Sequence, residues 1–202
     1  MSPRPRSASD ADILEATARA VGRLGPHRLT LAEVGQAAGL SPATLIQRFG
    51  SKRGLLLAFA KQAGGLVSEQ FAAVRAAHES PLDALMEVSL AQTRYMDSPE
   101  ALSNHVAFLQ MDLNDPEFRA LAADGARRTE KEVRSLLDAA VDAAELTPCD
   151  TSGLARAIQA IFNGSIVFWA IHRKGSAESW VRKDLETLLT PYRRERGKRR
   201  KR

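Results

Sequence analysis

The stretch AAGLSPATLIQRFGSKRGLL, residues 37–56, decides how this chain folds. It interrupts a sequence rich in Ala and Leu with Gly39, the pair Ser41-Pro42 and Gly50. Glycine adopts the positive φ that ends a helix sharply. A serine followed by proline favours a helix start, because the serine caps the first turn and proline needs no N–H there. We therefore predict a helix over residues 30–38, a turn over 39–41 and a helix over 42–49.

Two short helices joined by a three-residue turn are typical of the helix-turn-helix motif. On spacing, the second helix presents Ala43, Thr44, Gln47 and Arg48 on its open face. An alanine methyl can meet the methyl group of thymine, and Gln and Arg can donate to base edges or phosphates. The structural alternative is an ordinary corner between two helices of a bundle.

The rest of the chain also reads as helical, which predicts an all-α fold of about nine helices. Apolar residues recur every three or four positions, and Ser80-Pro81, Ser98-Pro99 and Asp115-Pro116 mark further helix starts. The expected helices span about 10–24, 30–38, 42–49, 52–77, 81–97, 99–112, 116–145, 152–173 and 177–190. We expect an N-terminal arm and helix-turn-helix domain over 1–52, a helical domain over 53–192, and a basic tail over 193–202.

Composition and charge narrow the function classes. No apolar run reaches the ~18–20 residues of a membrane span, and the start of the chain lacks the apolar stretch of a signal peptide. Cys149 is the single cysteine, so we expect a cytoplasmic protein without disulfides or membrane contact. Residues 1–52, 53–192 and 193–202 carry net charges of +3, −5 and +7. A basic N-terminal segment suggests contact with a polyanion, whereas the tail fits either a solvated terminus or an auxiliary DNA contact.

Signs of catalysis are absent from the sequence. The four histidines are scattered and form no HxxxH or HExxH pair, and Cys149 has no evident base partner. The segment GRLG lacks the preceding strand and the following Lys-Ser/Thr of a phosphate-binding loop. We therefore expect no enzyme activity, no cofactor and no metal.

A longer segment makes the helix-turn-helix interpretation more specific. The sequence ILEATARAVGRLGPHRLTLAEVGQAAGLSPATLIQRFGSKRGLLLAF, which begins at Ile13, resembles the N-terminal domain of the TetR family of transcriptional regulators, and the resemblance covers about residues 10–59. The resemblance rests on the Gly25 turn, Thr30 opening a helix, the turn over 37–41, the Thr44-Leu45 pair, Phe49, and Ser51-Lys52 opening the next helix.

The resemblance implies a homodimer whose helix over 42–49 enters the major groove of double-stranded DNA. Thr30 and Lys52 would then hold phosphates, which set register without reading sequence. One position departs from the family, because Ile46 replaces an aromatic residue, usually tyrosine, that touches the DNA backbone. We therefore expect Gln47 and Arg48 to carry more of the contact. The expected DNA-binding residues are Thr30, Ser41, Ala43, Thr44, Gln47, Arg48 and Lys52.

The C-terminal half is less distinctive, and its sites follow from the resemblance. In the family, this half encloses a small-molecule cavity and pairs with its copy. The resemblance therefore implies a DNA-binding domain over 1–52 and a ligand-binding and dimerisation domain over 53–192. The segment AIQAIFNGSIVFWAIH, residues 157–172, is apolar almost all round and needs cover on several sides. A wholly intrachain core is the alternative to a partner subunit. Expected ligand-binding residues are Met96, Asn104, His105, Phe108, Met111, Asn163 and Trp169. Expected dimer-interface residues are Ile161, Gly164, Ser165, Phe168, Leu185, Leu188 and Leu189.

We predict a ligand-responsive regulator, most simply a repressor, that binds a near-palindromic operator as a homodimer. A small and largely apolar effector would release it, and the helix over 52–77 would transmit the change as one continuous lever. Two alternatives stay open: a DNA-binding regulator without an inducer, and a helical interaction module that never meets DNA.

Overall fold

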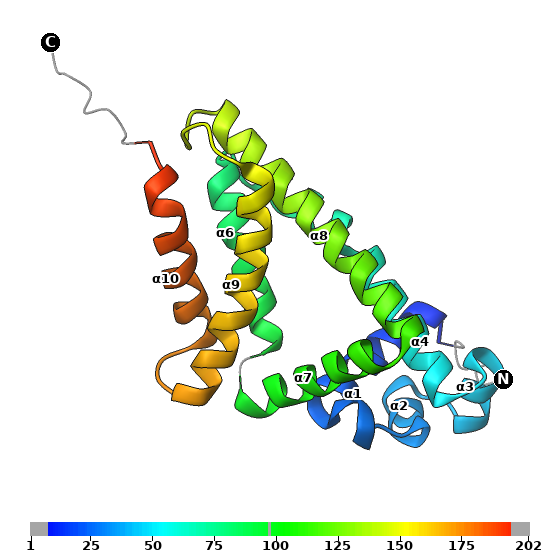
Figure 1. Ribbon diagram of the computed structural model, residues 1–202. Coiled ribbons are helices and arrows are strands. Elements are labelled where there is room, and N and C mark those ends of the chain that lie inside the picture. Colours follow the sequence, from blue (N-terminus) through cyan, green and yellow to red (C-terminus); the bar gives the residue numbers. More distant parts are fainter. Residues whose placement is uncertain (1–7, 97, 195–202) are drawn as a thin grey trace, which may run out of the picture. The chain divides into compact units, whose positions relative to one another are not determined.

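The computed structural model describes residues 8–96 and 98–194 (Figure 1). These residues form ten α-helices and two short 3-10 helices, and one isolated antiparallel bridge joins Leu146 to Arg193. The predicted all-α class is confirmed. The elements are α1 (Asp10–Arg28), α2 (Leu31–Ala38), α3 (Pro42–Phe49), α4 (Lys52–Gly65), α5 (Val67–Ala77), α6 (Pro81–Ala91), η1 (Gln92–Tyr95), α7 (Pro99–Asn114), α8 (Pro116–Asp142), α9 (Thr151–His172), α10 (Ala177–Leu189) and η2 (Thr190–Tyr192).

The predicted helix starts are largely confirmed by their capping bonds. At Ser41, Ser80 and Ser98 the serine side chain accepts the backbone N–H three residues later, and proline follows each serine. Thr30 and Glu33 form a full capping box, in which each side chain bonds the backbone of the other. Local sequence therefore sets where most of these helices begin.

The expected helix over 52–77 is wrong as a single element. The structure divides it into α4 and α5 at Leu66, directly after the pair Gly64-Gly65. Two adjacent glycines cost the helix roughly 1 kcal/mol each relative to alanine, so the break falls where helix propensity is lowest. The idea of one continuous lever from Lys52 is corrected accordingly.

The described chain forms two compact units. The N-terminal unit joins the residues up to Val67 with Ser98–Ala126, and the second unit joins Ser68 to Met96 with Arg127 to Arg194. These two units are defined by which residues pack together. The domain boundary expected at residue 52 separates functions instead, and it stays a prediction. Most of the predicted basic tail lies outside the described residues.

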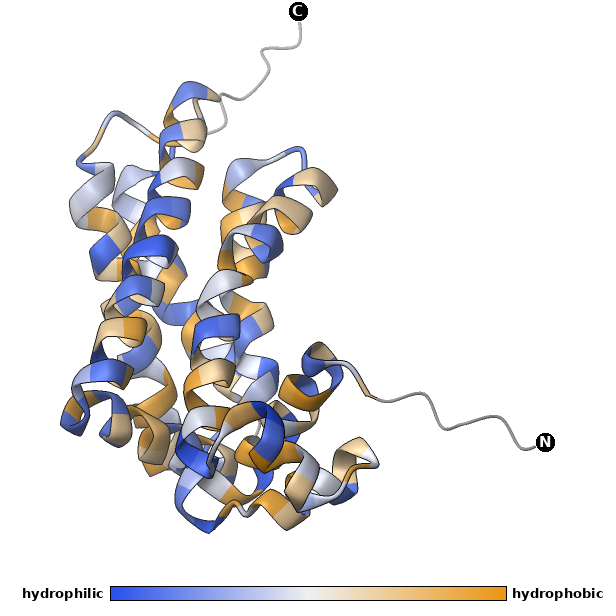
Figure 2. Ribbon diagram, turned by 90° about the vertical axis from the view of Figure 1, so that its right-hand side faces the viewer, coloured by the Kyte–Doolittle hydropathy of each residue, from blue (hydrophilic) through white to orange (hydrophobic). Residues whose placement is uncertain are grey.

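The N-terminal unit is built around α1, which packs against α2, α4 and α7. Gly25 interrupts α1 with a φ of 73°, and the amide of Asn104 on α7 donates to the Gly22 carbonyl over 2.8 Å just before that kink. The ribbon coloured by hydropathy shows apolar and polar residues alternating along the helices, as expected when one face of each is buried (Figure 2). The buried core consists of Ile13, Leu14, Ala20, Val21, Leu29, Val34, Leu45, Leu55, Leu56 and Phe118.

In the second unit α10 lies beside α9 and also packs on α6 (Figure 1). The Ser165 hydroxyl on α9 lies 2.6 Å from a carboxylate oxygen of Asp184 on α10. Among the described helices, α9 alone is long and apolar enough to cross a membrane by length and composition, and 33% of its most apolar window is buried. Such a window is also typical of a packed helix, and α9 packs against α10 in this way.

Candidate nucleic-acid interface

The turn between α2 and α3 depends on two glycines. Gly39 adopts the left-handed conformation, with φ 68° and ψ 30°, and the Leu40 N–H donates to the Gly35 carbonyl over 2.8 Å. At Gly35 itself an added Cβ would lie 2.6 Å from the Leu40 carbonyl oxygen. The turn therefore closes back onto α2 so tightly that Gly35 is needed as well as Gly39.

The helix α3 is seated by one buried residue. Leu45 is fully buried in the N-terminal core, whereas Ala43, Ile46 and Gln47 are exposed. Residues 43, 46 and 47 share one helical face because they are three and four positions apart. The structure therefore brings Ala43 and Gln47 together as predicted, and it adds Ile46 to the same face.

The hydroxyl groups expected at the DNA are engaged within the chain. The Ser41 and Thr44 hydroxyl oxygens lie 2.9 Å apart, and Ser41 Oγ accepts the Thr44 N–H. The Thr30 hydroxyl donates to the Glu33 carboxylate over 3.2 Å. A phosphate contact by Thr30 would therefore compete with a carboxylate that the structure already places beside it.

Arg48 is also engaged, which its sequence position did not show. Its Nη1 donates to the Ala8 carbonyl over 2.6 Å and lies 3.3 Å from the Asp10 carboxylate. The side chain of Arg48 keeps 29% of its surface exposed. Arg48 thus ties α3 to the start of α1.

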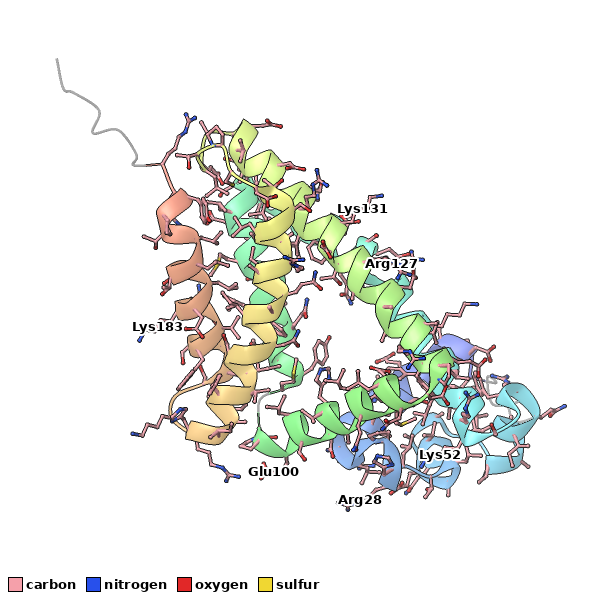
Figure 3. The ribbon with its side chains drawn as sticks, in the orientation of Figure 1. Arg28, Lys52, Glu100, Arg127, Lys131 and Lys183 are labelled. Carbon is pink, nitrogen blue, oxygen red and sulfur yellow. The ribbon has the colours of Figure 1, made fainter. Side chains whose placement is uncertain are left out.

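Lys52 bonds the opposite end of α1. Its ammonium donates to the His27 carbonyl over 3.0 Å, which leaves two further N–H donors. Arg28, which follows His27 in the chain, is exposed. Figure 3 labels Arg28 and Lys52 in the N-terminal unit. Arg28 was not among the expected DNA-binding residues, although the sequence places this basic residue two positions before the Thr30 cap. Lys52 and Arg28 are thus two cations near the start of α2.

The start of α4 is held by an ion-pair clamp. The Arg53 guanidinium makes three hydrogen bonds to the Asp115 carboxylate, at 2.8, 2.9 and 3.1 Å, and pairs with Glu117 at 2.5 Å. It also lies over the Phe118 ring. The bond from Arg53 lowers the pKa of Asp115, and the bonds from both carboxyl groups raise the pKa of Arg53. These contacts join α4 to the junction of α7 and α8.

The expected ligand-binding residues on α7 serve the N-terminal unit in this structure. The Phe108 ring packs edge-on between Phe59 and Phe118, with centroids 5.6 and 5.9 Å away. Met111 packs against the same core, and Asn104 holds the α1 carbonyl described above. Their ligand roles stay predictions, but each of these side chains already has a packing role.

The remaining ligand candidates lie in the second unit or on the outer face of α7. Met96 is buried, and the buried Trp169 donates its indole N–H to the Gly175 carbonyl. Asn163 donates to the Gln159 carbonyl within α9. Desolvation by the surrounding protein lowers the pKa of His105, although part of its side chain is exposed.

Asp112 lies one helical turn after Leu109 and two turns after His105, and it was not among the expected ligand-binding residues. Burial raises the pKa of its carboxyl to about 6. The exposed apolar side chains of Val106, Leu109 and Leu113, with 44%, 46% and 63% exposure, share this part of α7. This face, the α7 outer face, therefore combines apolar surface with a carboxyl whose ionisation is costly.

Replacing Asp112 with asparagine should change how stability depends on pH. A raised pKa in the folded state means that the wild type loses stability as pH rises from about 4 through about 6. The Asp112→Asn variant lacks this loss. Its melting temperature should therefore rise relative to that of the wild type between about pH 4 and about pH 6, and the difference should stay constant at higher pH. A difference in melting temperature between variant and wild type that is constant from about pH 4 to about pH 8 would contradict the raised pKa of Asp112.

The expected dimer residues divide by burial. Ser165, Leu185 and Leu189 are buried within the single chain, whereas Ile161, Gly164 and Leu188 are partly exposed. On α9, Val167, Phe168 and Ile171 are 40%, 57% and 67% exposed. We call these three residues the α9 outer strip; Phe168 is the one among them that belongs to the expected interface, and Val167 and Ile171 extend it.

Known proteins share both the motif and the fold. Residues 13–59 match the bacterial regulatory proteins of the tetR family, and residues 78–190 match the C-terminal part of BetI-type transcriptional repressors. The chain belongs to the TetR family. The HTH-type transcriptional regulator BetI of Rhizobium meliloti (strain 1021) is 30% identical over 119 residues, which are 57% of this chain and 58% of that relative. The match thus spans less than two thirds of that relative's length.

Solved structures agree with this TetR family assignment. PfmR, a TetR family regulator from Thermus thermophilus, has 27% identity and a TM-score of 0.62, with 88% of this chain and 97% of that one covered. A transcriptional regulator from Saccharomonospora viridis in complex with choline has 19% identity and a TM-score of 0.74, with 93% and 98% covered. The chain is a TetR family, DNA-binding regulator of the repressor type. The predictions of family and of no enzyme activity are confirmed, because TetR family members are transcription factors.

Proposed function

We propose that this TetR family regulator represses transcription as a homodimer that binds a near-palindromic operator and is released by a small molecule. The single observation that carries the DNA-binding half is the seating of α3. Leu45 is buried, and Ala43, Ile46 and Gln47 point outward from a turn that two glycines keep tight. A helix presented in this way suits the major groove, whose width admits one α-helix.

The α9 outer strip supports the homodimer. Its three large apolar side chains lie on a helix whose opposite face is covered by the chain's own residues. An exposed contiguous apolar surface favours a protein partner, and a second copy is the simplest one. Two heads related by a twofold axis would bind half-sites about 34 Å apart, or a multiple of that distance.

The α7 outer face supports effector binding. Apolar side chains beside a carboxyl suit a small organic cation, which gains both burial and charge pairing. The structural neighbour from Saccharomonospora viridis was solved with choline, so choline is the first compound to test. The effector must bind the DNA-free conformation better, and a coupling of about 1–3 kcal/mol would change operator affinity roughly 5–150-fold. A regulator of this kind acts in the cytoplasm, where its DNA lies.

The experiment is capture of fragmented genomic DNA by the purified protein at low salt, followed by sequencing. Enrichment of fragments that share a near-palindromic motif supports operator binding, and capture without a shared motif contradicts it. Titrating choline into the complex with an enriched fragment then tests the effector. Release at millimolar choline supports a cationic effector, whereas no release together with no choline-induced rise in melting temperature contradicts it.

Replacing Lys52 with alanine should weaken binding to all DNA sequences by a similar factor. The ammonium is expected to neutralise one phosphate, so its loss should reduce the slope of log affinity against log salt by about one. The measurement is a salt titration on operator and random DNA. Lys61→Ala, an exposed lysine later on α4, is the matched control and should leave the slope unchanged. A loss confined to the operator would contradict a phosphate role.

A further inference from the structure

The outward face of α3 has few free polar groups. The Ser41 and Thr44 hydroxyls pair with each other, and the Arg48 guanidinium is bonded to the start of α1. Gln47 is exposed, and no side-chain hydrogen bond of Gln47 lies within the described part of the chain. Gln47 is thus the polar group of this face that is most available to a base.

The same face carries exposed apolar surface. Ile46 is 51% exposed, whereas its neighbour Leu45 is fully buried, and Ala43 is exposed three positions before Ile46. Covering the Ile46 side chain would remove apolar surface from water and so favour binding to a partner that contacts it. In the major groove of B-DNA the apolar group on the base edges is the C5 methyl of thymine.

We propose that α3 reads its half-site chiefly through thymine methyl groups, with Ile46 and Ala43 contacting them. Gln47 adds a bidentate contact to the N6 and N7 positions of adenine, which glutamine matches by geometry. The base pairs under residues 43–47 are therefore A·T pairs, and Ile46 is a specificity-determining residue. This inference rests on the proposed operator binding and deepens it by naming the bases that are read.

Guanine is disfavoured as the main target by the position of Arg48. Bidentate recognition of guanine uses a guanidinium that faces O6 and N7. In the structure one guanidinium nitrogen of Arg48 is committed to the Ala8 carbonyl at 2.6 Å, with Asp10 beside it. A bidentate guanine contact that uses Nη1 would break these bonds and leave the Asp10 carboxylate without its partner.

The test replaces single thymidines of the selected operator with deoxyuridine, which keeps every hydrogen-bonding group and removes only the methyl. Burying one methyl contributes about 0.8 kcal/mol, so each contacted position should lose about fourfold in affinity. Ile46→Ala should bind the thymidine operator more weakly than the wild type does. Deoxyuridine at the position that Ile46 contacts should then lower the affinity of this variant little further. Leu66→Ala, an exposed apolar residue outside α3 at 39% exposure, is the matched control and should retain the full deoxyuridine loss.

Two results would overturn the inference while operator binding stands. One is wild-type affinity unchanged by deoxyuridine at every thymidine of the half-site. The other is the same deoxyuridine losses in Ile46→Ala as in the wild type, which would assign the methyl contact to another residue. A protein that selects no DNA sequence at all would overturn the proposed function and this inference together. The deoxyuridine series on the wild type needs no variant, so a folding defect in Ile46→Ala cannot mask the result.

Discussion

Replacing Gly54 with alanine should destabilise the N-terminal unit by about 2–4 kcal/mol and abolish operator binding at 37 °C. Gly54 lies in the first turn of α4, where its N–H donates to the Ser51 hydroxyl over 3.0 Å. A Cβ at this position would collide with the Phe49 carbonyl oxygen at the end of α3. That oxygen belongs to the backbone, so relief requires moving α3 or α4. The measurement is thermal unfolding of both proteins, followed by operator titration below the melting temperature.

Gly22→Ala is the matched control for this substitution. Gly22 lies within α1 of the same unit, and nothing lies within 4 Å of the Cβ that alanine would add. Because glycine is the poorer helix former, this variant should gain up to about 1 kcal/mol. Equal stability changes in the two variants would contradict the steric role of Gly54 and would point to a general effect of glycine replacement.

Replacing Phe168 with glutamate should dissociate the proposed dimer and reduce operator affinity by about 100-fold or more. A charge at this site of the α9 outer strip would be buried without a partner, which strongly opposes association. The loss of affinity follows because two linked heads gain 10²- to 10⁴-fold over one, as a general order of magnitude. Phe168 is 57% exposed in the single chain, so the monomer should keep its fold. Light scattering and operator titration measure the two effects.

Gln70→Glu adds the same charge to an exposed position of the second unit on α5, and it should leave both mass and affinity unchanged. A Phe168→Glu variant that stays dimeric at micromolar concentration would show that the α9 outer strip is not the interface. A monomeric variant that binds the operator as tightly as the wild type would instead show that dimerisation is unnecessary for operator binding.

Structural features that depend on a few adjacent residues, such as helix starts, were predictable from the sequence. The starts of α2, α3, α6 and α7 follow from a capping side chain, three of them with proline next to it, and the bounds of α3 are those predicted. Local chemistry determines such positions, because the capping bond joins residues three apart. The helix-turn-helix motif consists wholly of such local signals, so the order of its residues is enough to recognise it.

Features that depend on distant residues were not predictable in the same way. Glycine is required at positions 35 and 54 because a turn brings a backbone carbonyl oxygen so close that a Cβ would collide with it. The sequence alone does not give these distances. Arg48 looked free to meet DNA, but it bonds Ala8 and Asp10, about forty positions earlier. Leu185, expected at a dimer seam, is buried by the chain's own helices, and its dimer role stays a prediction. Periodicity identifies an apolar face but does not say which neighbour covers it.

The most direct test of operator binding by α3 is a footprint of the purified protein on a fragment enriched from its own genome. Dimeric binding by α3 predicts two protected half-sites related by an approximate twofold axis, with centres about one or two helical turns of DNA apart. It also predicts that Gln47→Ala loses protection of the half-sites while non-specific binding at low salt is retained. A single protected segment without internal symmetry, or a footprint that Gln47→Ala leaves unchanged, would contradict it.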